Sequence, residues 1–324
     1  MKITIILPYF GKFNNYFKFW LESCANNKNI SWMIFTDEKI PEIYPKNVTF
    51  IEMTLEKLKK IFEKKLKTKI NLERPYKLCD YKPYYGYLFS EYLQDVDFWG
   101  YCDCDLIFGD ILKFITEDQL KTYDKILRTG HLSLIKNKKE INENFLKYDT
   151  YKIVIKSSAI YGYDESVGGY HLGFAGELLD KGYKFLDDST YIADIDFRHY
   201  PFYVVSDEQI PCVFIYDHGH IYKVIRKQDK LYKEEMMYLH LQKRKMKVIE
   251  EVENNRYIIA PNEICLYDEL ELKSEKFWKK ISEEQEDYFD TKGEQRTLKK
   301  RDFIRFLHEP KKIESILYRL KGTK

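Results

Sequence analysis

The chain lacks the sequence features that are typical of membrane-spanning proteins, disulfide-bonded secreted proteins and proteins with a glycine-rich nucleotide-binding loop. Its longest apolar runs fall well short of the roughly 18 residues that a membrane-spanning helix needs. Its six cysteines are scattered without the spacing of a disulfide framework. No Gly-x-Gly-x-x-Gly or Walker-type loop follows the first apolar segment, where Gly11 stands alone. These absences argue against a membrane-spanning protein, a disulfide-stabilised domain, a dinucleotide enzyme and a P-loop ATPase.

The composition is that of an ordinary globular protein. The chain has 324 residues, of which 44% are hydrophobic, and a net charge of +2. This length suits one large α/β domain, or a domain of about 250 residues with an appendage. Residues 1–8 resemble the start of a signal peptide, but their apolar run is short and no small-residue cleavage site follows. We therefore expect a first strand there, a reduced cytoplasmic protein, and no nucleic-acid partner.

Segments with strand and helix character alternate over the first hundred residues. Strands are expected at 2–8, 31–36, 48–53 and 98–104, and helices at 15–26, 54–67 and 77–94. Such alternation is typical of right-handed crossovers and a mainly parallel sheet. Beyond Asp110 the pattern is less regular, and no repeat or low-complexity linker interrupts it. We predict one α/β domain over residues 1–265 and a basic helical extension over 266–324.

The segment from Phe98 to Asp110 carries the most specific chemical signal. An apolar and aromatic run ends in Asp103 and Asp105, and Gly109-Asp110 follows closely. On an extended strand, residues two apart point to the same face, so these carboxylates repel each other unless a cation lies between them. Oxygen ligands favour Mg²⁺ or Mn²⁺, which suits a diphosphate-bearing substrate. The alternative is a pair of solvated aspartates that close a strand at a turn.

Several of these residues resemble a known family. Lys77-Leu-Cys-Asp80-Tyr-Lys82, the expected helix after it, and the Asp-x-Asp segment resemble the core of GT-A glycosyltransferases. They are most similar to the glycogenin and lipopolysaccharide galactosyltransferase group, and to mannosyltransferases with a Lys/Ser-Asp-x-x-Arg helix before Asp-x-Asp. The chain also resembles bacterial capsule and lipopolysaccharide synthesis proteins. The order of elements agrees over about residues 1–250, but the motifs agree only over 77–110.

The resemblance implies a Rossmann-like GT-A fold and a function. The protein would transfer a hexose from a UDP-sugar to a glycan or lipid-linked glycan acceptor in bacterial surface polysaccharide synthesis. Mn²⁺ or Mg²⁺ would be held by Asp103, Asp105 and a late histidine, for which the chain offers His240 with Lys243 close behind it. The residues expected to bind the nucleotide-sugar are Pro8, Tyr9, Phe10, Asp37, Lys77, Asp80, Lys82, Asp103 and Lys243.

The histidines admit more than one interpretation. His240 lies in an alternating, strand-like run and can complete a mostly oxygen-ligated site, or it is a half-buried strand histidine. His218 and His220 share a face and are the second choice for the metal ligand; no cysteine or acid pair at zinc-site spacing accompanies them. His131 and His171 lie beside turn glycines, so they belong either to an acceptor pocket or to surface loops.

An acid pair is the candidate for catalysis. An inverting enzyme needs a carboxylate base to deprotonate the acceptor hydroxyl, whereas a retaining one needs only a nearby polar or carboxylate group. Asp164 and Glu165 lie between an aromatic residue and glycines, although an acidic surface loop is the alternative. Similar retaining families have Asp-Gln or Asp-Asn here, so Glu165 leaves the stereochemistry open. A second Asp-x-Asp at 194–196 lacks a preceding apolar strand and is interpreted as a loop.

The C-terminal region is strongly basic. Residues 292–324 hold eleven Lys or Arg against four Asp or Glu, so this tail carries about +7 and the rest of the chain about −5. Phe303, Phe306, Leu307 and Leu320 recur there at helical spacing. Such a helix either lies on an anionic membrane, on the inner face of the cell membrane, or packs on its own domain with a solvated basic face.

Two other classes of function remain open. In a phosphatase of the haloacid-dehalogenase type, Asp103 would attack phosphorus, Asp105 would be the acid/base, and Asp187-Asp188 would be the late metal-binding pair. Against it, three strand-like segments precede Asp103, and Ile107 stands where that family has Thr or Val. A non-catalytic carbohydrate-binding protein would instead use the faces of some of the 28 tyrosines for sugar rings.

Overall fold

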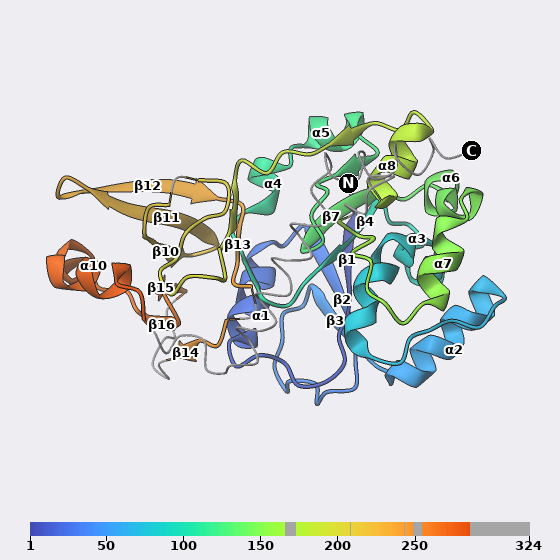
Figure 1. Ribbon diagram of the computed structural model, residues 1–324, viewed down its shortest axis with the longest axis horizontal. Coiled ribbons are helices and arrows are strands. Elements are labelled where there is room, and N and C mark those ends of the chain that lie inside the picture. The colour runs from blue at the N-terminus through green and yellow to red at the C-terminus, as the bar shows by residue number, and fades with distance from the viewer. Residues whose placement is uncertain (166–172, 208, 243, 249–254, 286–324) are drawn as a thin grey trace, which may run out of the picture.

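The computed structural model describes residues 1–165, 173–207, 209–242, 244–248 and 255–285. The largest sheet crosses the middle of the molecule in Figure 1. Its strand order is β3 (Val48–Glu52), β2 (Ile30–Thr36), β1 (Ile3–Pro8), β4 (Phe98–Cys102), β7 (Leu132–Lys136), β6 (Lys125–Ile126), β8 (Phe185–Leu186). The first four strands are parallel, and β7 is antiparallel to both β4 and β6. The predicted mixed α/β class with a mainly parallel sheet is therefore confirmed.

Helices cover both faces of the parallel strands, which explains why β1 is buried along its whole length. Alternate residues of β1 face opposite sides. Ile5 packs with Trp20 of α1 (Phe17–Asn26), while Ile6 packs with Phe62 of α2 (Leu55–Leu66). The strands predicted at 2–8, 31–36, 48–53 and 98–104 and the helices predicted at 15–26 and 54–67 agree with these elements to within a few residues.

The helix predicted over residues 77–94 differs from the observed structure. The segment forms a 3₁₀ helix, η1 (Pro75–Tyr84), one short α-helix, α3 (Tyr85–Leu88), and a second 3₁₀ turn, η2 (Ser90–Tyr92). Pro83 lies inside η1, where it lacks an N–H donor and its ring opposes a regular α-helical turn. Tertiary packing holds the segment instead, because Tyr81, Tyr84 and Tyr85 are fully buried.

A second, six-stranded sheet lies beside the first (Figure 1, left). Its order is β12 (Lys230–Met236), β11 (His220–Lys227), β10 (Cys212–Asp217), β15 (Arg256–Ala260), β16 (Glu263–Leu266), β14 (Lys247–Val248), with antiparallel pairs throughout except β14–β16. Phe277 and Trp278 of α10 (Glu275–Ser282) pack on this sheet, next to α9 (Glu269–Lys273). The sequence did not predict this sheet. The basic tail lies outside the described residues.

A three-stranded sheet joins distant parts of the chain. β13 (Tyr238–His240) is antiparallel to β5 (Leu106–Phe108) and parallel to β9 (Ile192–Asp194). His240 is thereby opposite Leu106 on one side and Asp194 on the other. The remaining helices are α4 (Ile111–Phe114), α5 (Glu117–Thr122), α6 (Lys139–Asn142), η3 (Asn144–Lys147), α7 (Thr150–Lys156) and α8 (Gly173–Asp180). Among the described residues, no helix has the length and apolar character to cross a membrane.

Candidate active site

The Asp-x-Asp turn, residues 103–105, connects β4 to β5 and is anchored through its backbone. The Trp20 Nε1–H donates to the carbonyl of Asp103 over 3.0 Å, and the Asn14 amide donates to the carbonyl of Cys104 over 2.9 Å. From the other side, the N–H of Leu241 donates to the carbonyl of Asp105 over 2.9 Å. Because the backbone is held on both sides, the two aspartate side chains have defined positions.

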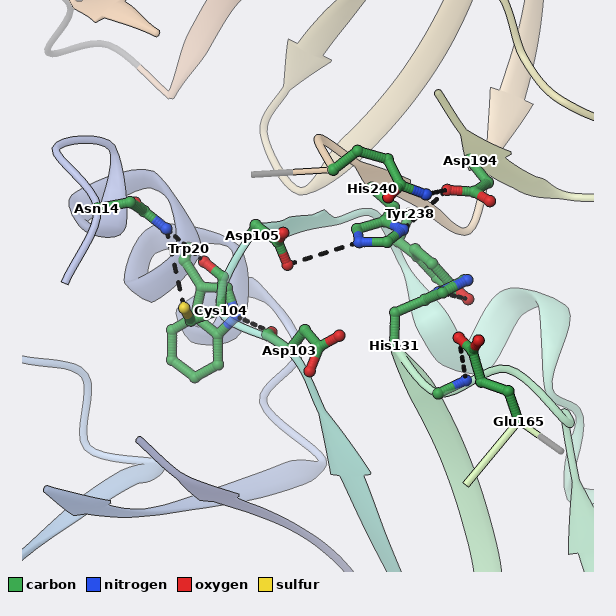
Figure 2. A network of polar contacts seen from close by, with 12 residues as sticks. Asn14, Trp20, Asp103, Cys104, Asp105, His131, Glu165, Asp194, Tyr238 and His240 are labelled. Carbon is green, nitrogen blue, oxygen red and sulfur yellow. Dashed lines mark hydrogen bonds and ion pairs between the residues drawn. The ribbon is translucent and has the colours of Figure 1, made fainter. Parts of the chain in front are cut away.

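The two aspartates and His240 converge. One carboxylate oxygen of each aspartate and one ring nitrogen of His240 all lie within 4.8 Å of one another. Figure 2 shows Asp105 facing the His240 ring, with Asp103 below them. The Asp105 and His240 side chains are only 6% and 9% exposed, whereas that of Asp103 is 35% exposed. The group is therefore open to an incoming ligand on the side of Asp103.

The donor atoms fit a hard divalent cation. Two carboxylates and one imidazole suit Mn²⁺ or Mg²⁺ better than a soft metal. Burial lowers the pKa of His240, but Asp105 and Asp194 outweigh burial and raise it to about 10. Without a cation, the ring is therefore protonated between two carboxylates. A metal ion needs an unprotonated ring nitrogen, so a cation bound by His240 would take the place of this proton.

Asp194 is the residue of this site that sequence reasoning missed. It ends β9 and lies 2.8 Å from Nδ1 of His240, whereas the 194–196 segment was interpreted as a loop. Although burial raises its pKa, hydrogen bonds from His240 and Gln242 keep the pKa of Asp194 below its usual value. The short apolar pair Ile192-Ala193 before it was the available signal for a strand.

His131 forms the wall of the site next to His240. The two rings stack at 4.4 Å between centroids, and Nδ1 of His131 is 2.8 Å from the hydroxyl of Tyr238. Burial, with the neighbouring His240, lowers the pKa of His131 to about 3, so the ring is neutral. His131, Asp194 and His240 form a second group of possible metal ligands. The other histidine predicted for the acceptor, His171, lies outside the described residues.

Lys82 connects the aspartate turn to the predicted catalytic pair. Its Nζ lies 2.7 Å from Oδ1 of Asp103, 3.4 Å from Oδ2 of Asp164 and 2.8 Å from the carbonyl of Gly130. Burial disfavours the charge, but Asp103 and Asp164 hold the pKa of Lys82 well above its usual value. This cation lies between the carboxyl groups of two segments that are 61 residues apart in the chain.

Asp164 and Glu165 have different environments. Asp164 is buried, and burial raises its pKa to about 7 against the opposing effect of Lys82. Glu165 is exposed and accepts a hydrogen bond from the N–H of Gly130 over 3.1 Å. A Cβ atom at Gly130 would come within 2.6 Å of Asp164 Oδ2. An added side chain at Gly130 would therefore displace these acids, of which Asp164 lies beside Lys82.

Lys77 and Asp80 form a buried ion pair, whereas the sequence suggested a place in the nucleotide-sugar site. Lys77 Nζ lies 2.7 Å from Asp80 Oδ2, and the two side chains are 1% and 0% exposed. Lys77 also donates to the carbonyl of Ala159, and Asp80 accepts the N–H groups of Tyr161 and Tyr163. These contacts between described residues are all internal, so the pair holds the segment before Asp164. Its expected contact with the ribose or sugar stays a prediction.

The residues after the first two strands that were predicted to bind the nucleotide-sugar also have different surroundings. Tyr9 is half-buried after Pro8, the last residue of β1, and its ring stacks on Phe13 at 5.0 Å. Phe10 is buried in the core. The Asp37 carboxylate accepts the N–H of Gly11 over 2.8 Å and so holds the loop that follows Tyr9. Lys243 lies outside the described residues.

The alternative metal ligands lie elsewhere. His218 and His220 belong to the β10–β11 hairpin, where their Nδ1 atoms lie 2.7 Å from Asp217 and 2.8 Å from Glu235. Neither belongs to a group of possible metal ligands among the described residues, whereas His240 belongs to both groups.

Residues 5–268 match the model of a family of unknown function (DUF6625), and the chain belongs to this family. No curated protein matches it. Similar solved structures include the apo form of the glycosyltransferase GlyE of Streptococcus pneumoniae TIGR4, with 14% identity and a TM-score of 0.34 over 59% of this chain and 46% of GlyE. The chain thus matches less than half the length of GlyE.

Two other solved structures are similar to the same extent. The galactosyltransferase LgtC, solved with donor and acceptor sugar analogues, has 14% identity and a TM-score of 0.33 over 60% of this chain and 76% of LgtC. A glycosyltransferase involved in glycosylation of the major capsid of PBCV-1 has 10% identity and a TM-score of 0.33 over 60% of this chain and 85% of that protein. At this level of similarity, function has to be inferred from the side chains of the site.

Proposed function

We propose that the protein is a metal-dependent GT-A glycosyltransferase that moves a hexose from a UDP-sugar to a glycan or lipid-linked glycan acceptor in bacterial surface polysaccharide synthesis. The observation that carries this proposal is the convergence of Asp103, Asp105 and His240 beyond the carboxyl end of β4, in a mainly parallel sheet. Ligands of such sheets bind at that edge. Residues 1–265 would form the catalytic domain and 266–324 an extension.

The proposed roles follow from charge and position. Asp103, Asp105 and His240 would hold Mn²⁺ or Mg²⁺, and the bound ion would neutralise charge on the leaving diphosphate. Lys82 lies 2.7 Å from Asp103 at this point, and Lys243 would face the diphosphate as well. Tyr9 and Asp37 would contact the nucleoside at the neighbouring strand ends.

Asp164 and Glu165 are proposed to serve the acceptor side. A carboxyl group with a pKa near the working pH can take a proton from an acceptor hydroxyl. The pKa of Asp164, which burial raises to about 7, fits this role. His131, neutral and next to His240, would contribute to the acceptor pocket, and His171 is proposed for the same pocket from its sequence context.

The decisive experiment separates metal binding from turnover. Calorimetry with Mn²⁺, and then with UDP in the presence of Mn²⁺, should show saturable binding to the wild-type protein. The Asp105→Ala variant should lose all of the metal-dependent binding. Asp110→Ala is the control, because that aspartate caps α4 by accepting the N–H of Lys113. Full activity of Asp105→Ala in the presence of EDTA would contradict the proposed site.

Substrate screening then tests the reaction. A panel of UDP-sugars with Mn²⁺ should show hydrolysis in the absence of acceptor and transfer in its presence. Sugar binding without either activity would indicate a carbohydrate-binding protein. Release of phosphate from simple phosphate esters would indicate the phosphatase, whose expected late acid Asp187 instead pairs with Arg128 over 3.2 Å.

A lipid-linked acceptor would require contact with the inner face of the cell membrane. We propose that residues 292–324 provide it through their excess of basic residues, since each contributes on the order of 1 kcal/mol near an anionic surface. Deleting them should reduce binding to anionic liposomes and spare UDP-sugar hydrolysis. If the truncated protein lost hydrolysis or became insoluble, the tail would be packing on the catalytic domain.

A further inference from the structure

The second nitrogen of His240 has a partner of its own. Nδ1 lies 2.8 Å from Oδ1 of Asp194, while Nε2 faces Asp105 at 3.6 Å (Figure 2). From this arrangement we infer that Asp194 is a positioning residue, which fixes the orientation and tautomer of His240 so that Nε2 is presented to the cation. The inference rests on the proposed metal site and adds a residue to it.

The tautomer follows from the hydrogen bond. A carboxylate can only accept, so Nδ1 of His240 must carry the proton that it shares with Asp194. When a cation binds, Nε2 is then the nitrogen with a free lone pair. Metal-ligating histidines commonly donate their other ring N–H to a carboxylate, which fixes the ring and makes the ligating nitrogen more basic.

The second distance is consistent with a shared cation. Two ligands at right angles, each bonded at about 2.1 Å to one ion, are about 3 Å apart. The 3.6 Å between Nε2 of His240 and Oδ1 of Asp105 is close to this spacing. A small movement of either side chain would complete the geometry.

Asp194 is itself held in place, as a positioning residue has to be. It is paired with His240 in the register of β9 and β13, and the Gln242 amide donates to the same Oδ1 over 2.6 Å. The N–H of Val205 donates to the Asp194 carbonyl over 2.8 Å. Backbone and side chain are therefore both fixed before any ligand binds.

Direct ligation by Asp194 is the competing arrangement. It would use the group of His131, Asp194 and His240, with Nδ1 of His240 as the ligand. Nε2 would then be left against Asp105, and Asp103 and Asp105 would contribute nothing. Nδ1 of His131 is also engaged with the Tyr238 hydroxyl. Positioning by Asp194 uses both aspartates of the turn and both nitrogens of His240.

The test measures Mn²⁺ affinity by calorimetry, in the full chain and without substrate. Asp194→Ala should weaken binding by about 10–100-fold, the usual effect of losing a carboxylate behind a ligating histidine. Asp194→Asn should lose less, because its amide oxygen can still accept the Nδ1 proton. Asp196→Ala is the matched control: it removes the other aspartate of the same segment, which pairs with Arg198 and not with His240.

A double-mutant cycle separates positioning from ligation. In a His240→Ala background, Asp194→Ala should cause no further loss of Mn²⁺ affinity, and pulsed electron paramagnetic resonance should show no imidazole nitrogen on the ion. If Asp194→Ala alone left the affinity unchanged, or weakened it equally with and without His240, the positioning role would be wrong. Wild-type protein that binds Mn²⁺ but turns over no UDP-sugar would contradict the proposed function alone.

Discussion

The segment from Lys77 to Lys82 forms two lysine–aspartate pairs with opposite surroundings. Lys77 and Asp80 are both buried, and their other hydrogen-bond partners are backbone groups. Lys82, only a turn away, pairs with Asp103, whose side chain is 35% exposed at the candidate metal site. The distance between charged atoms, 2.7 Å, is the same in both pairs.

The difference separates an ion pair whose partners are all internal from one that could serve the proposed site. A buried pair whose contacts are all internal has no side open to a ligand, and removing one partner leaves the other charge buried without compensation. A pair with one open side can exchange a partner for a ligand. We call these the closed pair, Lys77–Asp80, and the open pair, Lys82–Asp103, and the predictions below test this division.

The largest effect is expected next to the open pair. Asp164→Asn keeps the shape of the side chain that contacts Lys82 and removes its charge. If Asp164 is the base, turnover should fall by about 10²–10⁴-fold with Mn²⁺ and donor binding nearly unchanged. Steady-state kinetics with a UDP-sugar would measure this, with Glu165→Gln as the comparison for the exposed acid. A loss of donor affinity in place of turnover would put Asp164 beside the sugar hydroxyls.

The next largest effect concerns stability and the closed pair. Asp80→Ala leaves the ammonium of Lys77 buried without its carboxylate, so the free energy of unfolding should fall by about 3–5 kcal/mol. Urea denaturation followed by circular dichroism would show it. Asp149→Ala is the control, because Asp149 forms a lysine pair of the same spacing with Lys152 on the surface. Similar shifts for the two variants would refute the structural role of the closed pair.

A smaller effect is expected from Lys82→Met, and it is a gain rather than a loss of Mn²⁺ affinity. Removing a positive charge beside a cation site should strengthen Mn²⁺ binding, by about tenfold for a charge a few Å away in a partly solvated site. The same variant should weaken binding of the UDP diphosphate. Calorimetry with Mn²⁺ alone and then with UDP would resolve the two effects. Weaker Mn²⁺ binding would mean that Lys82 is needed to hold Asp103 in place.

The smallest effect concerns pH. Burial raises the pKa of Glu177, on α8, to about 7 from 4.5. The native protein therefore holds this proton more tightly than the unfolded chain does, and Glu177 lowers stability increasingly as pH rises from about 4.5 to about 7. Glu177→Gln should be more stable than wild type at pH 8 and no more stable at pH 4. Equal urea midpoints at pH 8 would show that Glu177 stays charged at little cost.

The parallel half of the fold could be predicted because each of its strands can be recognised from its own stretch of sequence. Ile3–Pro8 and Phe98–Cys102 are apolar runs buried on both faces, so their sequences alone mark them as central strands. In the second sheet, β10 and β15 are similar buried runs, but the other strands are short or largely polar, so the sheet as a whole gave no regular pattern. Lys230–Met236, for example, is an edge strand in which only Met236 is fully buried.

The site was predictable in part for a similar reason. The spacing of Asp103 and Asp105 is visible in the sequence, and their place after an apolar strand indicates a sheet edge. The contact of Asp194 with His240 depends on strands that are 46 residues apart in the chain and pair only in the folded protein. The same holds for the contact of Lys82 with Asp164. Tertiary pairing of this kind leaves no periodic pattern to detect.

The three-stranded sheet also determines when the site can exist. Its strands begin at Leu106, Ile192 and Tyr238, so the last of them leaves the ribosome long after the first four strands of the large sheet. Domains fold during synthesis as their elements become available. A nascent chain shorter than 240 residues lacks His240, so it could not gain the stability that a cation bound at the proposed site would supply. If the proposed site binds a cation, that binding would stabilise only a chain whose translation has passed His240.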